Sequence, residues 1–173
     1  MNIEIKNTSL LSMVDDKIKN TNIYIKDDII THVGKLDDFD ADRVIDGSKF
    51  ITMPGFINAH THVAMSYFRN YGNDNDLMTW LNDYIFPAEE KLNEDIVYNA
   101  SLLSFAEMIR TGTTSFADMY FFEDVTIRAL NKAKLRGQIA RGLTCPDPEN
   151  SRIKKNIDLH KKYNGLNKKI EMA

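Results

Sequence analysis

The chain has 173 residues, of which 43% are hydrophobic and 27% are charged, a composition typical of a globular protein. Its formal net charge of -3 provides no basic surface for a nucleic acid, so we expect no nucleic-acid partner. No apolar run approaches the roughly 18 residues that span a bilayer, and the N-terminus lacks the pattern of a secretory signal, so we expect no membrane partner either.

The chain contains a single cysteine, Cys145, which excludes an intrachain disulfide. A lone cysteine suits a reducing compartment, and we therefore expect a cytoplasmic protein. Because Cys145 stands beside Pro146 with no histidine nearby in the sequence, we interpret it as a passive residue and not as a nucleophile.

Residues 1–52 carry short apolar runs that predict strands. Apolar and polar side chains alternate in residues 3–5, 23–25 and 29–33, and aspartate pairs and glycines mark the turns between them. We predict a small antiparallel β-sheet region as a first domain, followed by a second domain over residues 53–173. His32 lies in the third run and is expected on the strand surface.

The segment PGFINAHTHVAM, residues 54–65, joins a Pro-Gly turn to an apolar stretch and two histidines. Side chains alternate along a strand, so Asn58, His60 and His62 are expected on one face. The residues expected on the opposite face are Ile57, Ala59 and Val63. Two imidazoles at a strand end can share a metal ion, although the same spacing also fits two polar residues on a half-exposed strand. The Pro-Gly context, in a chain with only four histidines, favours the metal site.

The rest of the chain alternates predicted helices and strands. Asp76 can cap a short helix that Pro87 closes, and Asn93 can cap a longer helix that ends at Gly112. The apolar stripe of this longer helix is expected at Tyr98, Leu102, Phe105 and Ile109. The later segments are a strand at 113–122, a helix at 124–135 stopped by Gly137, a strand at 138–144, a helix at 151–163 with Ile153, Ile157 and Leu159 on its apolar side and His160 exposed, and a strand opening at 169–173. This alternation is typical of parallel βαβ units, and we count three complete units and part of a fourth.

The histidine segment resembles the amidohydrolase superfamily, in which a P-G-φ-[IV]-[ND]-x-H-x-H segment forms the first strand of a (β/α)8 barrel. The resemblance implies that His60 and His62 bind the catalytic metal, zinc or iron. It also implies that residues 1–52 form a partial β-sandwich domain and residues 53–173 form the N-terminal part of a metal-dependent hydrolase barrel. A complete barrel takes about 250 residues, so about three and a half βα units are expected here.

Several further blocks resemble the 5′-methylthioadenosine/S-adenosylhomocysteine deaminases within this superfamily. They are Leu77-Met78-x-Trp80-Leu81, Pro87-Ala88-Glu89, Glu107-Met108-x-Arg110-x-Gly112-x-Thr114, Phe116-Ala117-Asp118-Met119-Tyr120-Phe121 and Arg141-Gly142-Leu143. The resemblance implies that Trp80 packs on a nucleoside and that Glu89 binds its ribose hydroxyls. It further implies that Arg141, and Arg152 through a gapped match, reach the carboxylate of S-adenosylhomocysteine. Without the resemblance, Trp80 would be a packing residue and Glu89 a solvated acid.

The chemistry implied is hydrolytic deamination of an adenine nucleoside: 5′-methylthioadenosine, S-adenosylhomocysteine or adenosine. A bound metal ion would lower the pKa of the attacking water. In the family, the general acid and further metal ligands come from later strands, which would lie beyond Ala173. Asp118 is interpreted as structural support. We therefore expect the 173-residue chain alone to be inactive, and to associate with itself or with a complementary C-terminal half. Two alternatives stay open: another member of the family, such as a guanine deaminase or a chlorohydrolase, and a non-catalytic half-barrel that acts only in assembly.

Overall fold

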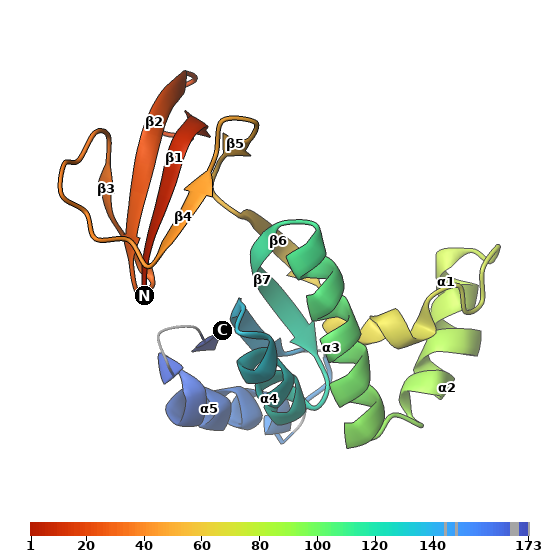
Figure 1. The fold of residues 1–173 in the computed structure, drawn as a ribbon. Coiled ribbons are helices and arrows are strands. Elements are labelled where there is room, and N and C mark those ends of the chain that lie inside the picture. Colours follow the sequence, from red (N-terminus) through yellow and green to blue (C-terminus); the bar gives the residue numbers. More distant parts are fainter. Residues whose placement is uncertain (144, 148, 167–169, 173) are drawn as a thin grey trace. The chain divides into compact units, whose positions relative to one another are not determined.

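The computed structural model describes residues 1–143, 145–147, 149–166 and 170–172 (Figure 1). The chain divides into two units, Met1–Pro54 and Gly55–Ala173. In the part of the chain that is described, no helix is both long and apolar enough to cross a bilayer.

The first unit contains strands only. They are β1 (Asn2–Leu11), β2 (Ile18–Lys26), β3 (Ile29–Val33), β4 (Arg43–Asp46) and β5 (Ile51–Thr52). The second unit carries strands β6 (Phe56–Thr61), β7 (Thr113–Tyr120), β8 (Arg136–Arg141) and β9 (Ile170–Met172). Its helices are the 3-10 helix η1 (Val63–Phe68), α1 (Leu77–Thr79), the π-helix η2 (Trp80–Ile85), α2 (Phe86–Glu89), α3 (Glu94–Arg110), α4 (Glu123–Ala133) and α5 (Ser151–Tyr163).

The sheet of the first unit is mixed, so the prediction of an antiparallel sheet was wrong in part. Strands β1, β2 and β3 pair antiparallel, as the alternating runs predict. Strands β4 and β5, however, both pair parallel to β1 along its free side, giving the order β3-β2-β1-β4 with β5 beside β1. The long connection after β3 brings the chain back across the sheet, and strands as short as β4 and β5 leave little periodic signal in the sequence.

The second unit is built on a parallel sheet with the order β6-β7-β8-β9. Neighbours along the chain are neighbours in the sheet, and helices α3, α4 and α5 lie between successive strands in the sequence (Figure 1). The prediction of a mixed α/β chain is therefore confirmed.

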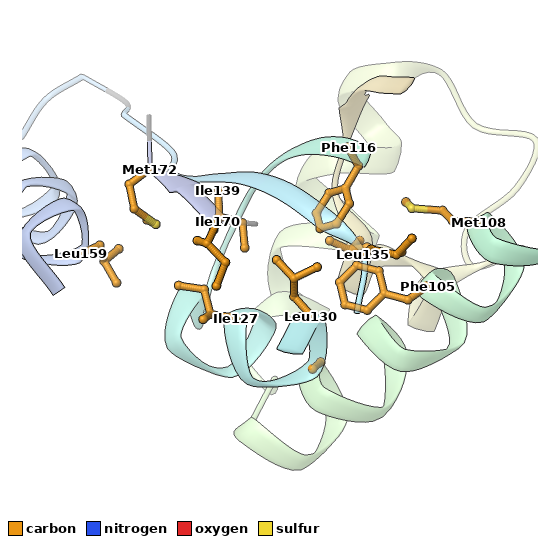
Figure 2. Close-up of a cluster of buried hydrophobic side chains, with 12 residues drawn as sticks. Phe105, Met108, Phe116, Ile127, Leu130, Leu135, Ile139, Leu159, Ile170 and Met172 are labelled. Atoms are coloured by element: carbon orange, nitrogen blue, oxygen red, sulfur yellow. The ribbon is translucent and has the colours of Figure 1, made fainter. Parts of the chain in front are cut away.

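Helices α3 and α4 bury one face of this sheet. Phe105 of α3 and Phe116 of β7 are 0% and 3% exposed, and their ring centroids lie 5.0 Å apart. Leu130 of α4 and Ile139 of β8 extend the same cluster (Figure 2). A buried Phe or Leu contributes about 1.5–3 kcal/mol relative to exposure, so this cluster is a main source of stability for the second unit.

Helix α3 begins as predicted, but the face that it buries is rotated relative to the predicted apolar stripe. The Asn93 side chain accepts a hydrogen bond from the Ile96 amide, which confirms the cap. Of the predicted stripe, Phe105 is fully buried and Ile109 is 52% exposed. The residues that take the buried face with Phe105 are Val97, Ala100, Ser101 and Met108. The helix contacts η1 as well as α4, and this second contact shifts the buried face towards Val97 and Ala100.

Gly137 does not stop a helix, contrary to the prediction. Helix α4 ends at Ala133, followed by Lys134 in the left-handed conformation, and Gly137 lies inside β8. A Cβ atom on Gly137 would lie 2.7 Å from the Phe116 ring and 2.9 Å from a Leu130 methyl group. The glycine is therefore explained by close packing under the helices and not by chain reversal.

Helix α5 has the predicted bounds, but only part of its predicted apolar side is buried. Leu159 is 2% exposed, whereas Ile153 and Ile157 are 45% and 48% exposed in the described chain. The exposed positions predicted for His160 on this helix and for His32 on β3 are confirmed.

Candidate active site

The two histidines of the PGFINAHTH segment lie side by side at the carboxyl end of β6. The ring centroids of His60 and His62 are 5.1 Å apart and the rings are inclined by 78°. His62 Nδ1 lies 2.6 Å from the backbone carbonyl of Met119, which can only accept. Nδ1 of His62 therefore carries a proton, and in the neutral ring Nε2 is the nitrogen left to bind a metal ion. This is the arrangement in which a backbone carbonyl orients a metal-binding imidazole.

The strand does not alternate as regularly as predicted. Between the pairs Asn58–Phe116 and Thr61–Asp118, β6 has one residue more than β7, a β-bulge. Asn58 is therefore paired with Phe116, whose ring is buried under the helices, and the prediction that it shares the histidine face was wrong. Val63 is buried, as predicted. Ile57 and Ala59, predicted to be covered, instead line an open hollow of about 470 Å³.

The pair of imidazoles fits part of a metal site. Nitrogen ligands suit both zinc and iron, and a catalytic zinc takes three protein ligands and a water. Among the residues that the structure describes, no three His, Cys, Asp or Glu side chains cluster as a metal site. His60 and His62 would therefore supply two ligands of a larger set.

Asp118 supports the loop that carries the histidines. Its side chain is 5% exposed, and Oδ1 accepts a 2.7 Å hydrogen bond from the Val63 amide, next to His62. Burial, together with the nearby charge of Glu123, raises the pKa of Asp118 to about 7, although the bond from Val63 opposes the shift. The carboxylate thus ties β7 to the turn after β6, in agreement with its predicted structural role.

The segment after the histidine loop is a helix with an irregular middle. Asp76 accepts from the amides of Met78 and Thr79, so the predicted cap is confirmed. Pro87, predicted to close the helix, instead lies in the first turn of α2. The π-helical turn before it bonds the Phe86 amide to the Leu81 carbonyl, five residues back. This wider turn allows the helix to continue past a proline, which has no amide proton to donate.

A pocket of about 490 Å³ brings together four of the predicted site residues: His62, Trp80, Glu89 and Arg152. Apolar side chains make up most of its wall, and the polar groups are few. The other lining residues are Met65, Leu81, Ile85, Phe86, Met119, Tyr120, Phe121 and Gly142. The volume and the apolar wall are typical of sites for small organic molecules.

Trp80 and Glu89 are both fixed by hydrogen bonds. The Trp80 indole Nε1 donates to the Tyr71 carbonyl at 2.9 Å, and its ring lies in the pocket wall. Glu89 Oε1 accepts from the Tyr120 hydroxyl at 2.6 Å. Burial and this bond raise the pKa of Tyr120 above its usual value, so the hydroxyl stays protonated and donates.

Arg141 lies in a second hollow of about 600 Å³, which shares Glu89 with the pocket. Its guanidinium stacks 4.5 Å from the centre of the Phe121 ring, and Nη1 lies 3.6 Å from Glu123 Oε1. Glu123 is 3% exposed, and within the described chain its Oε1 has no hydrogen bond, since 3.6 Å exceeds hydrogen-bonding distance. Arg141 therefore does not line the pocket itself, but Glu89 lines both the pocket and the hollow that contains Arg141.

Three residues of the site were missed in the sequence. Tyr120 contacts Glu89, the Met119 carbonyl orients His62, and Glu123 faces Arg141. Tyr120 and Met119 lie in a block whose composition predicts a buried strand. Glu123 resembles an ordinary acidic residue in the first turn of a helix. The sequence could have indicated these residues through their position at or just after the end of a predicted strand. The ends of neighbouring parallel strands meet at one edge of a sheet.

Comparison with known proteins gives matches over most of the chain. A model of the amidohydrolase family matches residues 51–169. A 5-methylthioadenosine/S-adenosylhomocysteine deaminase of Thermoanaerobacter pseudethanolicus is 46% identical over 174 residues, which cover 99% of this chain and 40% of that protein. A 5′-deoxyadenosine deaminase of Methanosphaera stadtmanae is 49% identical over 142 residues, which cover 82% of this chain and 33% of that protein.

Among solved structures, an adenosine deaminase from Xanthomonas campestris with bound zinc matches with a TM-score of 0.85 and 25% identity. The match covers 99% of this chain and 42% of that one. The chain thus spans less than half the length of the relatives it matches. Because the family model covers most of its residues, the chain belongs to the amidohydrolase family.

Proposed function

We propose that this chain carries the nucleoside-binding and part of the metal-binding side of a hydrolase that deaminates adenine nucleosides. The observation that carries the proposal is the pocket in which Trp80, Glu89 and His62 meet. An aromatic face, a carboxylate and an imidazole are the groups needed to stack on a base, accept from ribose hydroxyls and hold a metal ion. The names of the two relatives support an adenine nucleoside as substrate.

The parallel strands of the second unit are, in this proposal, the first units of a (β/α)8 barrel. Two features support it: the strands follow one another in sequence order across the sheet, and the pocket lies where they end. Active sites of such barrels lie at the carboxyl ends of the strands. The general acid and the further metal ligands would then come from strands that follow in the relatives.

Each of the site residues of this chain has a distinct role in the proposed reaction. His60 and His62 would hold a zinc or iron ion, with His62 oriented by the Met119 carbonyl. When bound, the ion supplies Lewis acidity and lowers the pKa of a water molecule. Trp80 would stack on the base, and Glu89 would bind the ribose, so that C6 of the adenine faces the histidines. Glu89 would also favour nucleosides over free bases, because a free base offers no ribose hydroxyls to its remaining acceptor positions.

The side chain of Arg141 would recognise the carboxylate of S-adenosylhomocysteine, with Arg152 assisting from the pocket wall. A guanidinium matches a carboxylate in shape as well as charge. In the described structure Arg141 faces Glu123, so a substrate carboxylate would compete with Glu123 for it. 5′-Methylthioadenosine lacks the carboxylate and would not need Arg141.

The test uses two preparations: the 173-residue chain, and a chimera that joins it to the C-terminal part of the T. pseudethanolicus protein left uncovered by the match. We expect the chimera, loaded with zinc, to deaminate 5′-methylthioadenosine, and the short chain to be inactive. Glu89→Ala in the chimera should lower kcat/KM for nucleosides by about 10²-fold, the size expected for loss of a charged hydrogen-bonding partner. Glu90→Ala, which changes the neighbouring exposed acid, is the matched control. An inactive but folded chimera that binds no nucleoside would instead favour a non-catalytic assembly role.

A further inference from the structure

The hydrogen bond between Tyr120 and Glu89 joins a rigid element to an irregular one. Tyr120 is the last residue of β7, is 6% exposed and packs on Phe121 with ring centroids 4.8 Å apart. Glu89 ends α2, a helix of four residues that follows a π-helical turn. A side chain on a sheet strand is held more precisely than one at the end of a short helix.

The bond also leaves Glu89 able to accept further donors. The Tyr120 hydroxyl lies 2.6 Å from Oε1, and an ionised carboxylate offers about four acceptor positions on its two oxygens. One of these positions is occupied by Tyr120. Glu89 lines the pocket together with Trp80 and His62, so the remaining positions are within reach of a ligand there.

We propose that Tyr120 is a positioning residue, whose hydroxyl fixes the Glu89 carboxylate so that its free lone pairs meet the vicinal hydroxyls of a ribose. The inference rests on the proposed function and adds to it the residue that orders the ribose-binding group. A glutamate loses rotamer freedom when it binds a ligand, and a carboxylate already held by Tyr120 has lost part of that freedom beforehand. Tyr120 thereby increases affinity for nucleosides with both hydroxyls and leaves the base contacts unchanged.

A competing role for the Tyr120 hydroxyl predicts the opposite effect on binding. If Tyr120 occupied the lone pairs that the ribose needs, its hydroxyl would compete with the ligand. Removal of the hydroxyl would then strengthen binding of nucleosides, whereas the positioning role requires that binding weaken. The Tyr120 hydroxyl contacts Oε1 alone, which leaves Oε2 for a ligand and favours positioning.

Trp80 provides the readout for the test. It is the single tryptophan of the 173-residue chain and lines the pocket, so its fluorescence reports ligands bound there. The chain is titrated with adenosine and with 2′,3′-dideoxyadenosine, which has the same base but neither hydroxyl. Tyr120→Phe should weaken adenosine binding about tenfold, the lower end for a hydrogen bond to a charged group, and should change dideoxyadenosine binding less than twofold. Tyr67→Phe, at a ring that is 59% exposed, should change neither affinity.

A double-mutant cycle separates positioning from general damage. Glu89→Gln should also weaken adenosine selectively, and Tyr120→Phe should add little once Glu89 is changed. A second measurement needs no ligand and leaves Tyr120 in place. The ¹³Cζ resonance of Tyr120 should move in Glu89→Gln but not in Glu90→Gln. Equal losses for both nucleosides, additive losses in the double variant, tighter adenosine binding or an unmoved resonance would each overturn the inference. If the unmodified chain bound neither nucleoside while the resonance moved, the proposed function would fail, and the ribose-binding role with it.

Discussion

Replacing Arg141 by alanine should destabilise the protein strongly, apart from any effect on substrate. Its partner Glu123 has a side chain that is 4% exposed, and no hydrogen bond to Oε1 is found within the described residues. The Arg141 guanidinium, 3.6 Å away with a side chain that is 24% exposed, is the cation that offsets this buried charge. Arg141→Ala removes the cation and leaves the carboxylate in place. We expect a loss of about 3–5 kcal/mol, the usual cost of breaking a buried ion pair from one side.

The magnitude can be checked against the geometry. Two unit charges at this separation attract by about 4–5 kcal/mol at an effective dielectric constant of about 20. Loss of the stacking of Arg141 on Phe121 adds about 0.5–2 kcal/mol. Water that enters the vacated space solvates Glu123 and offsets part of the loss. A net cost of about 3 kcal/mol is thus the lower bound that the arrangement supports.

Arg128 provides a closely matched control. It lies 3.7 Å from Glu94 and 5.2 Å from the Tyr98 ring centre, so it makes the same two kinds of contact as Arg141. Both members of that pair are more than half exposed, and Arg128→Ala should cost at most about 1 kcal/mol.

The assay is urea unfolding followed by circular dichroism. The variants are Arg141→Ala, Arg128→Ala and the double variant Arg141→Ala with Glu123→Gln, which removes the unpaired charge. The double variant should be more stable than Arg141→Ala alone, because glutamine carries no charge to desolvate. Equal unfolding free energies for Arg141→Ala and Arg128→Ala would refute the reasoning, as would a double variant no more stable than Arg141→Ala.

Three further predictions concern the second unit. Asp118→Asn should be increasingly stabilising relative to the original protein as the pH rises from about 4 to about 8. Burial raises the pKa of Asp118 to about 7, so the folded state keeps a proton that the unfolded chain has released, and folding loses stability on the order of 4 kcal/mol over that range. Urea unfolding at several pH values measures the difference, and a difference independent of pH would contradict it. Gly137→Ala should cost about 1–3 kcal/mol, because its Cβ would overlap Phe116 and Leu130; an unchanged unfolding midpoint would show that the strand can shift. Strands β6 and β9 each pair on one side only within the described sheet, so we expect self-association or pairing with a complementary barrel half, and light scattering that shows a stable monomer would argue against it.

Elements of the second unit could be predicted where the residues that begin a helix form hydrogen bonds with their sequence neighbours. Asn93 and Asp76 are caps whose side-chain oxygens satisfy the first amides of a helix, and this bond needs only neighbouring residues. The segment around Phe116 is β-branched and aromatic, which favours a strand. By contrast, the face that α3 buries depends on which elements pack against it, and that information is spread over the chain. The apolar pattern therefore predicts that Ile109 lies in the core, although this residue is exposed.

The residues of the candidate site could be predicted where they belong to one sequence motif. They could not be predicted where the contact joins elements that are distant in the sequence. His60 and His62 stand two positions apart in one segment, so their proximity follows from the chain itself. The contacts Tyr120–Glu89 and Arg141–Glu123 join residues that are 31 and 18 positions apart, with regular elements between them. Only the order of the strands and the lengths of the crossovers bring such pairs together, and neither is encoded locally.

Two local irregularities of the second unit lie at the site, and each moves a side chain that a regular element would place elsewhere. The bulge in β6 adds a residue between Asn58 and Thr61, so Asn58 pairs with Phe116 and does not share the face of the two imidazoles. The π-helical turn at Trp80–Ile85 widens the helix, carries it past Pro87 and brings Trp80 and Glu89 to the same pocket. Bulges and π-turns lose regular hydrogen bonding and persist where the rest of the fold stabilises them. Periodicity in a sequence assumes that elements are regular, and so it fails at the very residues whose placement the proposed chemistry requires.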